Sequence, residues 1–121
     1  MKELPLLHWM PRVPGDIEKC LDFVARQPWG KPANRELDIY RGIDLIRLNP
    51  GGFRAQIWRA ETGIWLRRSY VAQFAIIYTF LPGSDDDPRG VVSIRAIRHQ
   101  RVGDVFQGVK EVPACYTGMA G

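Results

Sequence analysis

The sequence predicts a single α+β domain in which a helical hairpin packs on one face of a small antiparallel sheet. Two segments with apolar residues at helical spacing come early in the chain, and segments rich in β-branched and aromatic residues follow them. Short runs of glycine, proline and acidic residues separate the segments, as tight connections require. With 121 residues the chain can build one modest core. We place the domain at residues 1–106 and treat residues 107–121 as a C-terminal tail.

A short first strand is expected between Leu4 and Val13. Apolar residues alternate there, and Pro5 and Pro11 limit the segment to a sheet edge or to a few residues. We interpret His8 as a partly buried strand residue rather than a metal ligand, because no second ligand stands near it.

The first helix is expected to start at Pro14-Gly15-Asp16, with Asp16 as its N-cap. Apolar residues then recur at i, i+3, i+4 and i+7, which places them on one stripe of a helix. This stripe consists of Ile17, Cys20, Leu21 and Val24.

The second helix is expected to run from about Ala33 to Leu48 and to end at the Asn-Pro-Gly-Gly sequence of residues 49–52. Gly42 lies on its apolar stripe. Glycine inside a helix costs about 1 kcal/mol relative to alanine. Its presence therefore indicates close helix approach, and the alternative is that the glycine is tolerated there without a structural purpose.

Three consecutive strands are expected near residues 64–72, 73–81 and 90–101, with an acidic turn at residues 84–87 between the last two. Residues 53–64 show neither a clear helical nor a clear strand periodicity, so we predict no secondary structure for them. Strict alternation divides the last strand into two faces. One face should hold Val92, Ile94 and Ala96, and the other Ser93, Arg95, His99 and Arg101, with Ile97 as an apolar exception on the polar face.

Composition limits the function classes without selecting one. The formal net charge of +4 is compatible with an acidic partner, with nucleic acid or with an ordinary solvated surface. No apolar run is long enough to span a bilayer, and the N-terminus lacks a secretory signal, so we expect no membrane association. The separated residues Cys20 and Cys115 favour a reducing compartment, and therefore the cytoplasm. With His8 and His99 as the only histidines, we expect no metal and no cofactor.

Three stretches of the chain resemble the RelE/ParE superfamily of bacterial toxins, and the resemblance covers about residues 6–106. The most specific stretch is Ala96-Ile97-Arg98-His99-Gln100-Arg101, which matches the last core strand of many ParE-like members. Tyr70 and the segment Ile76-Ile77-Tyr78 also stand where such members carry a similar pattern. The other two stretches are Pro11-Arg12-Val13-Pro14-Gly15-Asp16-Ile17 with Phe23-Val24-Ala25, and Ile43-Asp44-Leu45-Ile46-Arg47-Leu48-Asn49-Pro50.

The resemblance implies the toxin component of a type II toxin–antitoxin pair. A ParE-like toxin inhibits DNA gyrase by binding, and this is the first expectation because the closest motif is ParE-like. The alternatives are a RelE-like, ribosome-dependent mRNA endoribonuclease and a non-toxic binding protein of the same fold, since the sequence departs from the ParE-like pattern after Arg101. The implied partners are a cognate antitoxin and either gyrase or the ribosome with its mRNA. DNA would be met only indirectly, through the antitoxin.

Metal-free RNA cleavage requires a base, an acid and cations that hold the phosphate. His99 is the candidate for proton transfer, and Arg67 and Arg95 are candidates for phosphate binding. No second proton-transfer group of matched pKa is evident, which favours binding over catalysis. The residues expected to contact a partner are Arg68, Arg101 and Tyr78.

Overall fold

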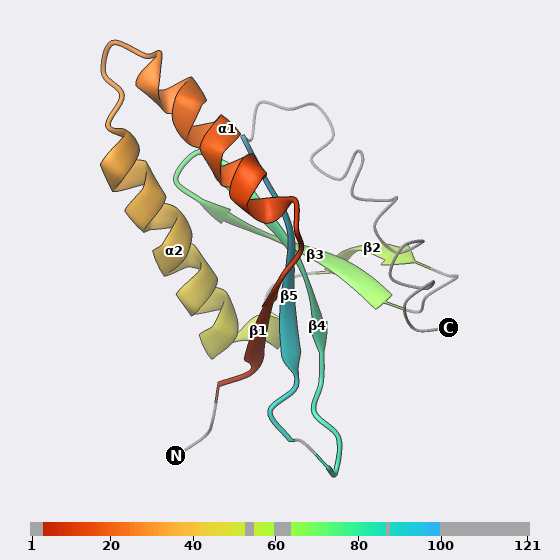
Figure 1. The fold of residues 1–121 in the computed structure, drawn as a ribbon. Coiled ribbons are helices and arrows are strands. Elements are labelled where there is room, and N and C mark those ends of the chain that lie inside the picture. The colour runs from red at the N-terminus through yellow and green to blue at the C-terminus, as the bar shows by residue number, and fades with distance from the viewer. Residues whose placement is uncertain (1–3, 53–54, 60–63, 87, 100–121) are drawn as a thin grey trace.

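A computed structural model describes residues 4–52, 55–59, 64–86 and 88–99. It confirms the predicted α+β fold, because two antiparallel helices cover one face of a single sheet (Figure 1). Within the described part of the chain, neither helix is long and apolar enough to cross a bilayer. The elements are β1 (Leu6–Trp9), α1 (Val13–Ala25), α2 (Pro32–Leu48), the short 3₁₀ helix η1 (Pro50–Gly52), β2 (Ala55–Arg59), β3 (Ile64–Val71), β4 (Phe74–Leu81) and β5 (Val91–His99).

The sheet has five strands in the order β1-β5-β4-β3-β2. Neighbouring strands are antiparallel except β1 and β5, which run parallel, so the sheet is mixed rather than wholly antiparallel as expected. A parallel pair requires a long connection, and here both helices and three strands lie between the two partners. Strand β2 falls in the segment that shows no clear periodicity in the sequence.

Helix α1 begins three residues before Asp16, so the expected N-cap assignment is wrong. Arg12 occupies the N-cap position without a side-chain capping bond, and a proline follows in the first turn, where its missing N–H does no harm. Asp16 is buried within that first turn. Its carboxylate is therefore available for contacts outside the helix.

Helix α2 matches its predicted extent closely, and Gly42 marks a close approach, but the neighbour is the sheet rather than another helix. A Cβ at this position would lie 3.0 Å from Val71 Cβ and 3.1 Å from Ile76 Cδ1. The absence of a side chain thus lets the backbone of α2 pack directly on β3 and β4.

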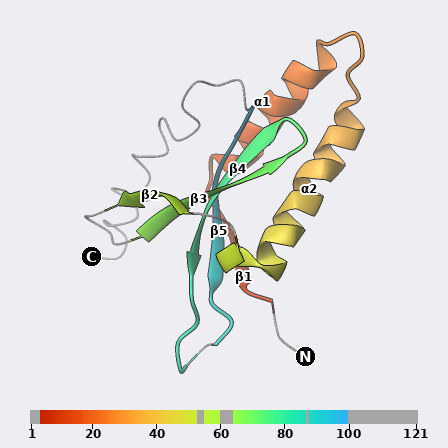
Figure 2. The ribbon, with the colours of Figure 1, turned by 180° about the vertical axis from the view of Figure 1, so that it is seen from behind.

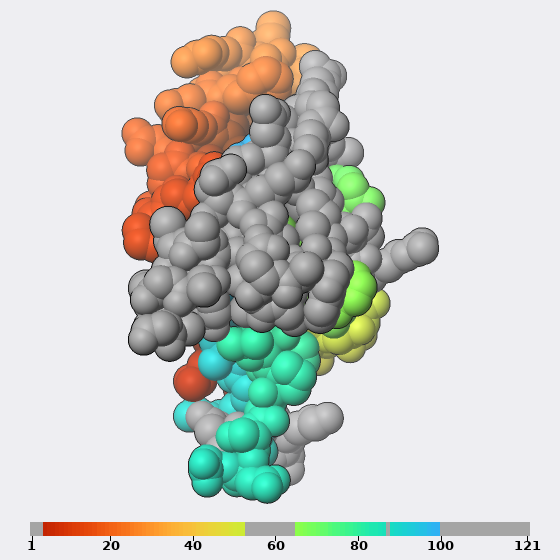
Figure 3. Space-filling model, turned by 90° about the vertical axis from the view of Figure 1, so that its right-hand side faces the viewer, coloured from red at the N-terminus to blue at the C-terminus, as the bar shows by residue number. Residues whose placement is uncertain are grey.

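Two apolar clusters lie on opposite faces of the sheet. The larger fills the space under the helices, and the smaller, against which Met10 packs, lies on the other face. Figure 2, seen from behind, shows η1 and the end of α2 beside β1 and β5. Figure 3 shows the β4–β5 hairpin projecting at one end of the molecule and the α1–α2 turn at the other. The larger cluster includes Val13, Ile17, Val24, Ile39, Ile43, Ile46, Phe74, Ile76, Tyr78, Val92, Ile94 and Ile97, and the smaller consists of Leu66, Ala75, Ile77 and Ala96.

A β-bulge interrupts the pairing of β4 with β5. Ile77 is opposite Ala96 and Tyr78 is opposite Ile94, which leaves Arg95 as the extra residue. An extra residue reverses the alternation of side chains beyond it. The face expected to hold Ala96 was therefore wrong: Ala96 belongs to the smaller cluster, and Ile97 faces the helices.

Candidate functional site

His99 lies at the end of β5, half-buried, on the face that the helices cover. Its ring centroid is 4.6 Å from that of Phe23 on α1 and 6.0 Å from that of Phe74 on β4. Phe74 is its direct partner across the strands, which fixes both side chains on the same face. His99 is therefore packed between aromatic rings beside α1.

Arg95 lies on the opposite face of the sheet and is only 2% exposed. Its Nε and Nη2 each donate to Thr79 Oγ1 at 3.3 Å, and its Nη1 lies 3.5 Å from Met10 Sδ. The bulge places Arg95 on this face and His99 on the other, so the sequence expectation that they share a face is wrong.

Arg67 lies on β3 directly opposite Tyr78, on the helix-covered face. His99 is opposite Phe74, which in turn is opposite Val71 on β3. Four residues along a strand span roughly 13 Å, and two strand spacings add roughly 10 Å sideways. The structure therefore does not bring His99 and Arg67 together, and it separates both from Arg95 by the thickness of the sheet.

Tyr78 was expected to contact a partner, but its side chain is fully buried. Its hydroxyl donates to the carbonyl oxygen of Pro50 at 3.0 Å and so ties β4 to η1. Burial raises the pKa of Tyr78 to about 12, and the positive charge of Arg67 opposes part of that rise. A neutral, hydrogen-bonded tyrosine at this position holds the fold together and offers no surface to a docking protein.

Arg68 is the expected partner-binding residue that does reach the surface of the described sheet. Its guanidinium lies 5.0 Å from the ring centre of Tyr70, which is 51% exposed. A cation over an aromatic ring is held in place while both groups remain accessible. Arg101 lies outside the described residues, as do the predicted tail and the turn residue Asp87.

Sequence reasoning missed a buried polar contact between α1 and β5. The Asp16 carboxylate accepts from Arg12 Nε at 3.0 Å and from the backbone N–H of Ile97 at 3.1 Å. The Cys20 thiol donates to the carbonyl oxygen of the same Ile97 at 3.8 Å. The i, i+4 spacing of Asp16 and Cys20 on one helix stripe was the available signal, because it places both side chains on the buried side.

Cys20 is held in its thiol form by this environment. Burial raises the pKa of Cys20 to about 11, and the negative charge of Asp16 contributes to the rise. A thiol with so high a pKa is a poor nucleophile at neutral pH. We therefore assign Cys20 a structural contact rather than a chemical step.

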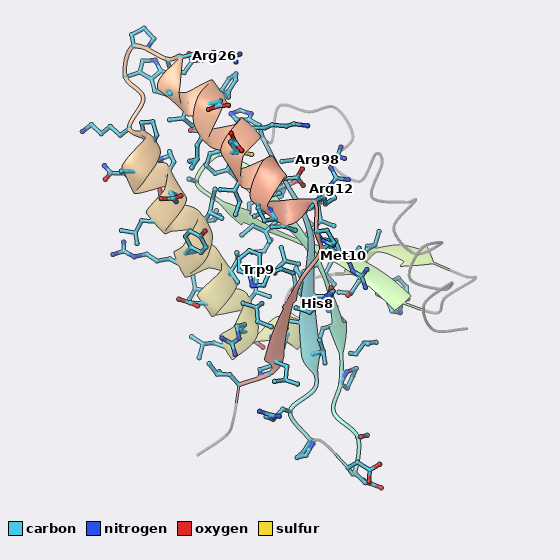
Figure 4. The ribbon with its side chains drawn as sticks, viewed as in Figure 1. His8, Trp9, Met10, Arg12, Arg26 and Arg98 are labelled. Atoms are coloured by element: carbon cyan, nitrogen blue, oxygen red, sulfur yellow. The ribbon has the colours of Figure 1, made fainter. Side chains whose placement is uncertain are left out.

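His8, the other histidine, is exposed on β1, and its Nδ1 lies 2.8 Å from Ser93 Oγ. Figure 4 shows His8 and Met10 on one side of β1, and Trp9 on the side toward α2. The same view places Arg98 beside Arg12 near the start of α1. Among the described residues, no three His, Cys, Asp or Glu side chains gather in a group that could hold a metal ion.

No protein-family model matches the chain, and no curated protein matches it either.

Proposed function

We propose that the protein is the toxin of a bacterial type II toxin–antitoxin pair and acts by binding its target, with DNA gyrase as the expected target. The order of elements supports this proposal: a first strand, two helices in a hairpin and then consecutive strands is the order that the RelE/ParE resemblance implies. The motif at residues 96–101 remains the strongest sequence feature behind it.

The dispersal of the candidate catalytic groups supports binding over RNA cleavage. General acid–base catalysis requires the proton-transfer group and the phosphate-binding cations within reach of one substrate. His99 lies against Phe23 on the helix side, whereas Arg95 is buried on the other side. A ribonuclease built from His99, Arg67 and Arg95 would need a substantial rearrangement of β5.

An acidic antitoxin segment is the partner that we propose for this cytoplasmic toxin. Such segments are often disordered alone and fold on binding. A chain with a net charge of +4 attracts such a segment at long range, which speeds the encounter. DNA would be contacted through the antitoxin only.

Expression of the isolated chain in a bacterium is the first test, followed by separate assays of DNA supercoiling and mRNA integrity. We expect growth arrest, loss of gyrase supercoiling activity and intact mRNA. Co-expression of the protein encoded next to it should restore growth. Absence of toxicity, or toxicity that no neighbouring protein neutralises, would refute the toxin assignment.

His99→Ala separates the two activities of the superfamily. If the protein acts by binding, this variant loses about 1 kcal/mol of stability with its aromatic contacts and retains its inhibitory mode. His8→Ala provides the matched control, because His8 is exposed and lies on another strand. Cleavage of ribosome-bound mRNA by the wild type, lost in a folded His99→Ala variant, would establish a ribonuclease instead.

A further inference from the structure

An apolar groove opens where the end of α2, η1 and the segment before β1 meet the base of the β4–β5 hairpin. Its volume is about 700 Å³. Its apolar lining includes Leu4, Leu48, Pro50, Phe80 and Pro88. Figure 2 shows the elements that form its walls, with η1 and the end of α2 next to β1 and β5.

Large apolar side chains are exposed at this groove. Leu48 is 66% exposed and Leu4 is 43% exposed. Leucines gathered in this way at a concave surface are typical of a protein interaction site.

The walls of the groove are held in place by hydrogen bonds, several of them partly buried. Arg47 donates through Nε and Nη2 to the carbonyl oxygen of Pro5, at 3.2 and 2.8 Å. Tyr78 donates to the carbonyl oxygen of Pro50, and Leu6 N donates to Gly90 O at 3.0 Å. A groove that is already formed loses little entropy when a ligand enters it.

The charge of the groove indicates what it would accept. Arg47 and Arg89 belong to its lining, and none of the described residues that line it is acidic. The groove between the two helices is the reverse, since Glu18, Asp22 and Glu36 line it and its described lining residues include no cation. Opposite charges attract and like charges exclude, so the two grooves select different partners.

We propose that the groove at the end of α2 binds a segment of a partner protein that combines acidic residues with large apolar ones. Apolar side chains would fill the space between Leu48 and Phe80, and carboxylates would pair with Arg47 and Arg89. Nucleic acid fits less well, because its affinity depends on many phosphate contacts and this lining is mainly apolar. The proposal rests on the proposed function only in identifying the partner as the antitoxin.

Fluorescence anisotropy with two labelled peptides tests this proposal. One short peptide contains leucine and glutamate, and its twin has glutamine in place of glutamate. We expect the full chain to bind the acidic peptide about 10-fold more tightly than the neutral twin, because the lining of the groove includes two arginines. Amide NMR shifts should change at Gly51 and Gly83, which line the groove, and not at Gly15.

Two substitutions on one helix give a matched comparison. Leu48→Glu removes an apolar wall and adds a repelling charge, and should weaken acidic-peptide binding at least about 10-fold. Leu37→Glu makes the same change at another exposed leucine of α2 outside the groove lining, and should change binding less than about 2-fold. Thermal unfolding of both variants checks that each remains folded.

The proposal is overturned if the acidic peptide does not bind, if the neutral twin binds equally well, or if both substitutions act alike. Failure of the proposed function gives a different result. If the chain is not toxic but its acidic-peptide binding is lost in Leu48→Glu, the groove proposal is supported and the toxin proposal is refuted. If the chain is toxic but its complex with the protein encoded next to it is unaffected by Leu48→Glu, the toxin proposal is supported and the groove proposal is refuted.

Discussion

The two halves of β5 differ in what hydrogen-bonds to the backbone N–H and C=O groups along the outer edge of the strand. From Val91 to Ile94 the edge pairs with the backbone of β1 in parallel register. Beyond Met10 the chain turns into α1, and the edge at Ile97 is met by side chains instead. The Asp16 carboxylate takes the N–H of Ile97, and the Cys20 thiol reaches its carbonyl oxygen.

This difference shows that an edge paired by backbone and an edge capped by side chains respond to different changes. Backbone pairing does not depend on which side chains the partner strand carries. Side-chain capping depends on two particular residues and, at Cys20, on a thiol that keeps its proton. Loss of a side-chain hydrogen bond at the edge and alkaline pH should therefore affect the first half of β5 little and the second half more strongly.

The largest effect is expected from Asp16→Ala, which removes the acceptor for the N–H of Ile97 and the ion-pair partner of Arg12. A buried donor left without a partner costs about 1–3 kcal/mol, and the lost ion pair adds to this. Chemical denaturation should show a loss of about 3 kcal/mol. Asp22→Ala, the same substitution at an exposed position of α1, should cost less than about 0.5 kcal/mol. Equal losses in the two variants would contradict side-chain capping.

The second-largest effect is expected from alkaline pH, which should lower the stability that side-chain capping of the second half of β5 provides. The pKa of Cys20 is raised from 9.0 to about 11, so the folded state keeps a proton that the unfolded chain loses above pH 9. The contribution of this proton to the free energy of unfolding is fully present below pH 9. As the pH rises toward 11, the free energy of unfolding falls by about 2 kcal/mol.

Cys20→Ser isolates this contribution. A serine hydroxyl can still donate to Ile97 O and does not ionise in this range. Tyr78, whose pKa of about 12 is also raised, acts equally in both proteins. Stability measured from pH 8 to 11 should fall more steeply for the wild type than for Cys20→Ser. Parallel curves would show that Cys20 does not set the slope.

The smallest effect is expected from His8→Ala in the half that β1 covers. The substitution removes one side-chain hydrogen bond, to Ser93 Oγ, and leaves the pairing of β1 with β5 intact. The free energy of unfolding should fall by less than about 1 kcal/mol. A loss as large as that of Asp16→Ala would erase the distinction between the two halves.

The helices and most strands could be predicted from the sequence because their apolar periods are regular. The stripe of Ile39, Gly42, Ile43 and Ile46 gave α2 to within one residue. The parallel pairing of β1 could not be predicted, since four residues carry no information on strand direction. Asp16 was misplaced for a related reason: its type favours an N-cap, but the tertiary contact with Ile97 determined its role.

The prediction of the candidate site depended on which face of the sheet each side chain of β5 occupies. The bulge reverses that alternation for the residues beyond it. Alternation correctly placed Val92 and Ile94 on one face, which the structure shows to be the face that the helices cover. After Arg95 the same rule put His99 on the wrong face, because nothing local in the sequence announces an extra residue there. Ile97, an apolar residue on the face predicted to be polar, was the available sign of an extra residue in β5. Shifting the alternation by one residue places Ile97 on the apolar face.

The pairing of β1 with β5 also constrains how the chain can fold as it is made. His8 and Ser93 are separated by 85 positions, and the sheet acquires its parallel edge only when both are available. Contacts between such distant residues form late and slow the folding of a small domain. During synthesis the N-terminal strand must therefore wait for nearly the whole domain to leave the ribosome, whereas both helical segments are complete by residue 48.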